Sequence, residues 1–177
     1  MTRITDRLNR TGDWLLPTLT RVVFLGMLFV YFWNSAMTKF GDGILGLLRP
    51  SNGAYFQIFP RAVEAAGYDL GQLGPVHWAI ALAGTWAEVL LPVAIVIGLA
   101  TRLAALGMTG FVLVQSYVDI TGHGGSLGAW LDAQTGDIVD VRAFWMLAFA
   151  VLLLKGAGPV SVDALLARRW GAAPQPA

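Results

Sequence analysis

One acidic residue lies in the middle of a long apolar stretch. Glu88 is the only charged residue between about positions 77 and 100. A charged side chain at mid-bilayer costs about 3 kcal/mol on insertion scales, so Glu88 must be paired, protonated or facing water. Desolvation favours the neutral acid, which makes proton uptake at neutral pH an expected chemistry. Pro92 lacks the N–H that would bond the carbonyl of residue 88, so this backbone oxygen is freed at the same depth.

Two other polar residues are expected at the depth of Glu88. With a helical rise of about 1.5 Å per residue, Glu88 lies roughly 18 Å from the inner end of its stretch. Asn34 and Gln115 lie roughly 20 Å from the inner ends of theirs. We therefore predict Asn34 and Gln115 as partners of Glu88, with Trp33 and Trp86 as aromatic walls of a ligand pocket.

Three readings of this polar layer are open. The first is hydrogen bonding between helices that holds a membrane bundle together. The second is a pocket for a quinone-like head group, in which Glu88 exchanges protons. The third is a proton or ion path. The fourth apolar stretch adds no polar group at this depth, which argues against a continuous channel.

Two charged residues extend the layer toward the outer side. Lys39 ends the first apolar stretch, where its long side chain would snorkel to the surface or pair with Glu88 or Asp119. Asp119 lies one turn beyond Gln115 on the same helical face. We include Lys39 and Asp119 among the ligand-binding candidates.

His77 and His123 are the only histidines, and both are expected near the outer ends of adjacent antiparallel spans. Two imidazoles across a helix pair are what a bis-histidine haem or a copper site would need. The simpler reading is a pair of exposed interfacial histidines, so no metal site is assigned.

Composition places these residues in a membrane protein. Of the 177 residues 56% are hydrophobic and 13% are charged, about half the charge of a soluble domain. The absence of cysteine excludes a disulfide, an iron–sulfur cluster, a thiolate zinc site and a sulfur nucleophile. A net charge of +1 gives no support to a nucleic-acid partner. No nucleophile–base pair or phosphate loop is visible, so a self-contained active site is not expected.

Four apolar stretches have the length that a bilayer core requires. They predict an all-α, single-domain chain (residues 1–177) that forms a four-helix transmembrane bundle. The expected spans are residues 16–40, 77–100, 103–120 and 139–155. Residues 41–76 and 121–138 are expected as outer loops, the first with a short interfacial helix over Tyr55–Ala66. Residues 156–177 are the expected inner tail.

The distribution of Lys and Arg predicts that both termini are cytoplasmic. Basic residues precede the first span, and others follow the fourth span. Arg102, between spans two and three, is interpreted as a topology determinant. In the inner tail, Ser161 is a predicted N-cap of a short helix over Val162–Arg169, and Asp163 lies in its favourable first turn.

Several of these segments together resemble the DoxX family of small four-helix membrane proteins. The resemblance covers about residues 20–166. The segments are Tyr31-Phe-Trp-Asn-Ser-Ala-Met-Thr-Lys39, Glu88-Val-Leu-Leu-Pro92, Gly98-Leu-Ala-Thr-Arg102-Leu-Ala-Ala-Leu106 and the Gly-x-Gly-x-x-Ser-x-Asp tail that ends at Asp163. Pro92, Arg102, Ser161 and Asp163 are assigned structural roles.

The resemblance implies a place beside redox enzymes. Some family members are similar to small subunits of a thiosulfate:quinone oxidoreductase, and others accompany bufferin-type copper-binding peptides. We therefore expect a multi-pass accessory subunit of the bacterial inner (cytoplasmic) membrane that binds quinone or a membrane or periplasmic redox partner. A non-catalytic assembly subunit of a larger membrane complex is the alternative, and a transporter of a small solute or metal is the third.

Overall fold

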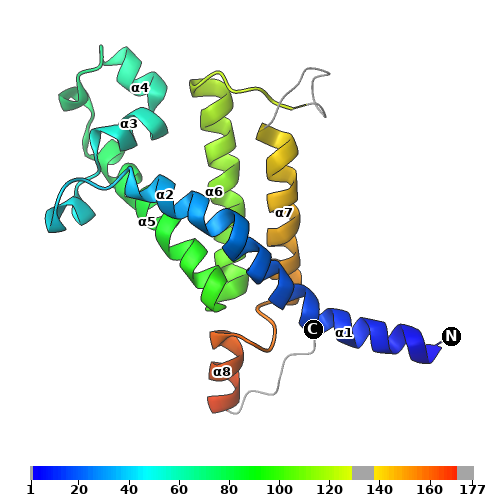
Figure 1. Cartoon of the computed structure of the whole chain (residues 1–177). Coiled ribbons are helices and arrows are strands. Elements are labelled where there is room, and N and C mark those ends of the chain that lie inside the picture. Colours follow the sequence, from blue (N-terminus) through cyan, green and yellow to red (C-terminus); the bar gives the residue numbers. More distant parts are fainter. Residues whose placement is uncertain (1, 129–137, 171–177) are drawn as a thin grey trace. The chain divides into compact units, whose positions relative to one another are not determined.

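The computed structural model describes residues 2–128 and 138–170 (Figure 1). This part of the chain is helical and contains no strand, so the all-α prediction is confirmed. Residues 129–137 of the predicted outer loop and residues 171–177 of the predicted inner tail lie outside the described residues.

Three helical segments of the described chain are long and apolar enough to cross a membrane. The first, Arg3–Met37, consists of α1 (Thr2–Phe24), the π-helical η1 (Leu25–Phe29) and α2 (Val30–Met37). The other two are α5 (Pro75–Ile97) and α6 (Thr101–Gly122). Helix α7 (Ile138–Lys155) has only 18 residues, and Asp140, Arg142 and Lys155 are among them. The fourth span therefore stays a prediction.

The helix ends differ from the predicted span ends. The first helix begins at Thr2, well before position 16, and α6 extends two residues beyond the prediction at each end. Helix α5 ends at Ile97 because Gly98 has a φ of +72°. Left-handed backbone of this kind ends a helix and favours glycine.

The segment between α2 and α5 contains more structure than the sequence predicts. It holds η2 (Ile44–Leu48), α3 (Asn52–Ile58), α4 (Pro60–Ala65) and η3 (Leu70–Gln72). The single helix predicted over Tyr55–Ala66 is wrong, because the chain breaks at Phe59, which has φ −127° and ψ 49°. Proline disfavours helical backbone in the residue before it and has no N–H of its own, so Pro60 starts a new helix.

Residues 156–170 of the predicted inner tail fold as the sequence predicts. Helix α8 covers Val162–Arg169, and the Ser161 hydroxyl accepts a hydrogen bond from the Ala164 N–H at 3.1 Å. Asp163 lies in its first turn, and Arg168 and Arg169 lie in its last turn.

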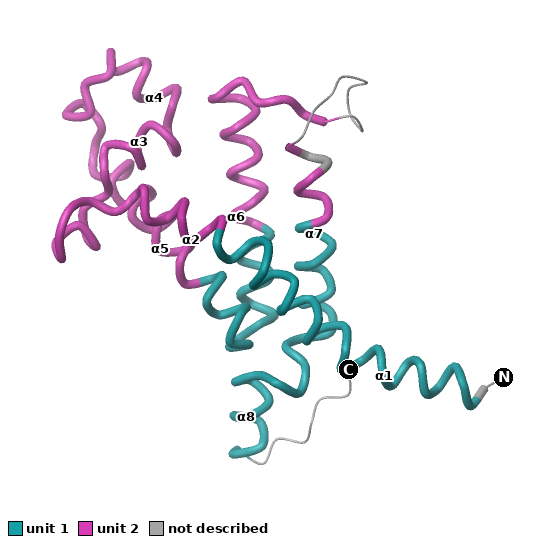
Figure 2. The backbone as a smooth tube through the Cα atoms, viewed as in Figure 1, with its two compact units in different colours: residues 1–30, 91–109, 145–177 teal, residues 31–90, 110–144 magenta. Residues whose placement is uncertain are grey.

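The chain divides into two compact units (Figure 2). Unit 1 contains residues 1–30, 91–109 and 145–177, and unit 2 contains residues 31–90 and 110–144. The buried apolar side chains of unit 1 include Phe24, Ile95, Met108, Phe149 and Leu152, and those of unit 2 include Phe32, Ala54, Val63, Ala81 and Val112.

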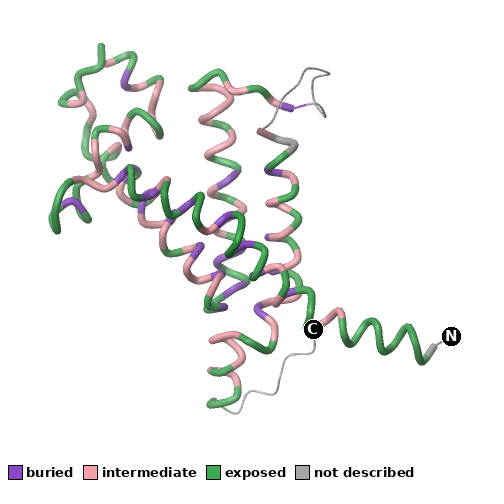
Figure 3. The backbone as a smooth tube through the Cα atoms, in the orientation of Figure 1, coloured by how far each residue is buried: buried purple, intermediate pink, exposed green. Residues whose placement is uncertain are grey.

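Many positions along the long helices are exposed (Figure 3), and large apolar residues are among them. Leu103 on α6 and Phe144 on α7 are both more than 70% exposed. Helices with exposed apolar faces of this kind require lipid or a partner around them.

Candidate functional site

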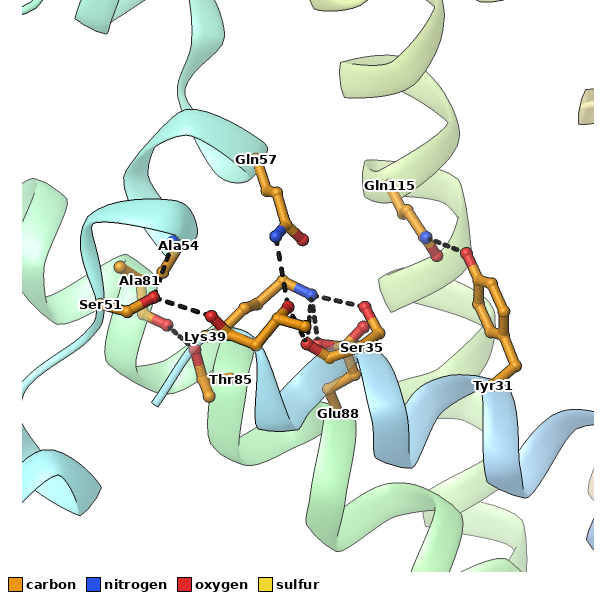
Figure 4. A network of polar contacts seen from close by, with 11 residues as sticks. Tyr31, Ser35, Lys39, Ser51, Ala54, Gln57, Ala81, Thr85, Glu88 and Gln115 are labelled. Atoms are coloured by element: carbon orange, nitrogen blue, oxygen red, sulfur yellow. Dashed lines mark hydrogen bonds and ion pairs between the residues drawn. The ribbon is translucent and has the colours of Figure 1, made fainter. Parts of the chain in front are cut away.

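The most deeply buried charges of unit 2 form one ion pair (Figure 4). The Lys39 Nζ lies 2.7 Å from the Glu88 Oε2, and the two side chains are 8% and 1% exposed. The same ammonium donates to the Ser35 Oγ at 2.6 Å and to the Ser35 carbonyl at 3.3 Å. Lys39 therefore does not snorkel to the surface; it neutralises Glu88 inside the protein.

Local structure explains why these two residues meet. Helix α2 ends at Met37, so Lys39 follows in the turn, one helical turn beyond Ser35. Glu88 lies near the middle of α5, and Thr85 on the previous turn donates to the Ala81 carbonyl at 2.7 Å. The Thr85 hydroxyl thus donates within its own helix. Glu88 pairs with Lys39 instead.

Ser51 holds the turn that carries Lys39. Its N–H donates to the Lys39 carbonyl at 2.8 Å, and its hydroxyl donates to the Thr38 carbonyl at 2.8 Å. The Ser51 hydroxyl also accepts the Ala54 N–H at 3.2 Å and so caps α3. Gln57 adds a bond from its amide to the Thr38 hydroxyl at 3.3 Å. The position of the Lys39 ammonium thus depends on the segment that follows it.

The loop at residues 41–50 packs against α5 through two tryptophans. The Trp86 indole donates to the Leu47 carbonyl at 2.9 Å, and the Trp78 indole donates to the Leu48 carbonyl at 3.2 Å. The ring of Phe40 meets the ring of Trp86 edge-on, with 5.4 Å between their centroids. Trp86, predicted as a pocket wall, therefore ties this loop to the helix that carries Glu88.

The predicted partners of Glu88 lie elsewhere. The Gln115 amide donates to the Tyr31 hydroxyl at 3.0 Å, and the Gln115 Oε1 is buried with no hydrogen-bond partner. Asn34 is exposed, as is Trp33. Equal helical rise predicts a common depth but not a common face. With about 100° between successive residues, Asn34 points away from the buried face of α2 that Phe32 and Ala36 form.

A second ion pair of unit 2 involves Asp119. Its Oδ2 lies 2.6 Å from the Arg142 Nη2, and the Arg142 Nη1 donates to the Ser116 hydroxyl at 2.9 Å. Asp119 thus pairs with Arg142 and not with Lys39.

The two histidines have separate partners. The His77 ring meets the Phe59 ring edge-on at 5.0 Å, and the His123 Nε2 lies 3.1 Å from the Gln57 carbonyl oxygen. No group of three or more His, Asp or Glu side chains among the described residues is placed to hold a metal ion. A haem or metal role for the pair gains no support from this geometry.

A polar centre in unit 1 surrounds Arg21. Its guanidinium donates four hydrogen bonds to backbone carbonyls, all between 2.6 and 2.9 Å. The acceptors are Ile95 and Val96 at the end of α5, and Ala157 and Val160 in the tail. The last carbonyls of a helix have no partner within it, so Arg21 satisfies two of those of α5 and joins them to the tail.

Asp163 completes this centre. Its carboxylate accepts the N–H groups of Ala100 and Thr101 at 2.7 and 3.0 Å, and its own N–H donates to the Gly98 carbonyl at 2.8 Å. One side chain thus lies in the first turn of α8 and caps the start of α6. Arg102, assigned as a topology determinant, donates to the Leu154 carbonyl at 3.2 Å.

Sequence reasoning missed the roles of Arg21, Arg142, Ser35 and Tyr31. The first two could have been found, since a charge within an apolar stretch requires a counter-ion or carbonyls. Ser35 and Tyr31 lie at successive i−4 positions from Lys39, so one polar stripe of the first span connects all three.

A family model described as DoxX matches residues 16–119, more than half of the chain. Neither a curated protein nor a solved structure matches the chain significantly. The matched region includes Arg21 and both members of the Lys39–Glu88 pair. The chain belongs to the DoxX family.

Proposed function

We propose that this chain is an integral membrane accessory subunit of a membrane redox system, and that it binds a quinone-like head group beside Glu88. The observation that carries the proposal is the buried ion pair between Glu88, in the candidate span α5, and Lys39, which follows the candidate span Arg3–Met37 by two residues. The partner would be a membrane or periplasmic redox protein that supplies or receives the electrons.

A buried ion pair by itself contributes little to the free energy of unfolding. Desolvation of the two charges offsets most of their attraction, and apolar residues of similar size often stabilise a protein as well or better. Ionisable residues within membrane spans are costly, and they mark ligand or proton sites by default. The pair therefore supports a site at which a proton or a polar ligand is handled.

The chemistry of the surrounding residues fits a quinone-like head group. Quinone oxygens accept hydrogen bonds, and quinol hydroxyls donate them. Lys39 supplies donors, and the longest of its three bonds, 3.3 Å to the Ser35 carbonyl, is the one that a ligand would replace most readily. The aromatic pair Phe40 and Trp86 supplies apolar surface.

The charge distribution supports the proposed topology in the bacterial inner membrane. Unit 1 contains the described chain ends and the turn after α5, and has eight Lys and Arg against three Asp and Glu. Unit 2 has four against eight. Since cytoplasmic segments are enriched in Lys and Arg, we place both termini in the cytoplasm.

A second candidate function is a non-catalytic assembly subunit. The specific observation in its favour is that the three acceptors around the Lys39 ammonium use all of its N–H groups. In this reading the pair only joins α5 to the segment that Ser51 and the two tryptophans organise.

Native mass spectrometry of the tagged chain in mild detergent separates the two candidates. The redox proposal predicts a quinone-sized molecule on the isolated chain, and its loss in the Lys39→Met/Glu88→Gln double variant, which leaves no unpaired charge. A stoichiometric protein partner without a small molecule on this chain would contradict quinone binding and leave the assembly role.

A further inference from the structure

The first turns of α1 form a basic amphipathic helix. Ile4, Leu8 and Leu15 are spaced by four and seven residues, so they share one face, and Ile4 and Leu8 are 69% and 67% exposed. Arg3, Arg7 and Arg10, also exposed, share a neighbouring face at spacings of four and three. Figure 3 shows this part of α1 as almost continuously exposed.

Contacts within unit 1 show where this segment leaves the core. The rings of Phe24 and Phe149 are 6.1 Å apart, and the Asp13 carboxylate pairs at 2.7 Å with Lys155, the last residue of α7. Between Phe24 and Asp13, α1 thus lies beside α7, up to the last residue of α7. Residues 3–12 extend beyond that end.

The sequence of α1 contains two residues at which the helix can bend, so that its first turns lie in the membrane plane. Gly12 and Pro17 stand on either side of the Asp13–Lys155 contact. Pro17 has no N–H for the Asp13 carbonyl, and proline and glycine are the residues at which helices kink. With such a bend, Ile4 and Leu8 would enter the interface and the arginines would remain at headgroup level.

We propose that residues 3–12 of α1 are a surface helix that binds the anionic phospholipid headgroups of the membrane in which the chain resides. Charge complementarity selects this occupant: the segment has three arginines and a single acidic residue, Asp6. Guanidinium groups bind phosphate oxygens in a bidentate manner. Each basic residue near an anionic surface increases binding by about fivefold.

The absence of native cysteine allows a clean test with single spin labels. Leu8→Cys places a nitroxide on the apolar face, and Asn9→Cys places one away from it. The full chain is reconstituted in nanodiscs of phosphatidylcholine with or without phosphatidylglycerol, and collisions with oxygen and with a water-soluble nickel chelate are measured. A separate single label at Leu103→Cys, on the exposed face of α6, reports correct insertion of the wild type and of the arginine variant.

The proposal predicts that phosphatidylglycerol makes the residue 8 label accessible to oxygen and shields it from nickel, while the residue 9 label stays accessible to nickel. Replacement of Arg3, Arg7 and Arg10 by Gln should abolish this dependence on lipid. Equal nickel access at both labels would overturn the proposal. Equal shielding in pure phosphatidylcholine would also overturn it, because the headgroup would then have no part. Shielding from both reagents would overturn it in favour of a protein contact.

Discussion

The Lys39 ammonium and the Glu88 carboxylate depend on each other as counter-ions. Removal of either one leaves the other as an uncompensated charge inside the protein. Three acceptors hold the ammonium at 2.6–3.3 Å, and the strongest of them is the charged Glu88. Loss of the carboxylate therefore leaves the ammonium with the neutral Ser35 acceptors alone.

Glu88→Gln should lower the free energy of unfolding by about 3–5 kcal/mol, because it leaves the Lys39 charge buried without a counter-ion. Lys39→Met combined with Glu88→Gln should recover most of this loss. Reversible unfolding in mixed micelles of dodecylmaltoside and dodecyl sulfate measures both variants. Equal stability of wild type and Glu88→Gln would show that the pair does not carry charge.

The Asp163 carboxylate caps the start of α6. Asp163→Ala should lower the free energy of unfolding by about 1–2 kcal/mol, because the Ala100 and Thr101 N–H groups lose their cap. Glu64→Ala, at an exposed carboxylate, is the control and should stay within about 0.5 kcal/mol. A smaller loss for Asp163→Ala than for the control would contradict the capping role.

At the scale of elements, the turn between α5 and α6 depends on Gly98. Its φ is +72°, and a Cβ there would lie 2.5 Å from the Ser161 Cβ and 2.9 Å from the Arg21 Cζ. Gly98→Ala should therefore cost about 2 kcal/mol or more. Gly110→Ala, in the middle of α6 with nothing within 4 Å, should instead stabilise the chain by roughly 0.5–1 kcal/mol. The same unfolding titration compares them, and equal effects would refute the packing argument.

The sequence predicts the helices better than their contacts. Long apolar runs and a Ser–Asp pair are local signals, so the all-α class and the bounds of α8 follow from them. The sequence offers Lys39 among several partners of Glu88 but does not select it, because the choice depends on where α2 ends and on which face Asn34 lies. Pro60 is a local signal for the break at Phe59. No local signal identifies the four carbonyls that Arg21 binds, because they come from segments more than 70 residues away.

For the whole molecule, the proposed topology can be tested by single cysteines in a chain that has none. Asn52→Cys lies on the exposed surface of α3, and Leu165→Cys lies on the exposed surface of α8. An impermeant maleimide should label the first in intact cells and the second only after permeabilisation. The opposite pattern would show the reverse orientation. Labelling of both cysteines in intact cells would exclude a cytoplasmic tail.

The most direct test of the proposed function is equilibrium binding of a short-tail benzoquinone to the purified chain in nanodiscs. Wild type and Glu64→Ala should bind it with equal affinity. Lys39→Met/Glu88→Gln, which removes both charges together, should bind at least about tenfold more weakly, the equivalent of 1.4 kcal/mol. Equal affinity in the double variant, or no binding by wild type, would contradict a quinone site at Glu88.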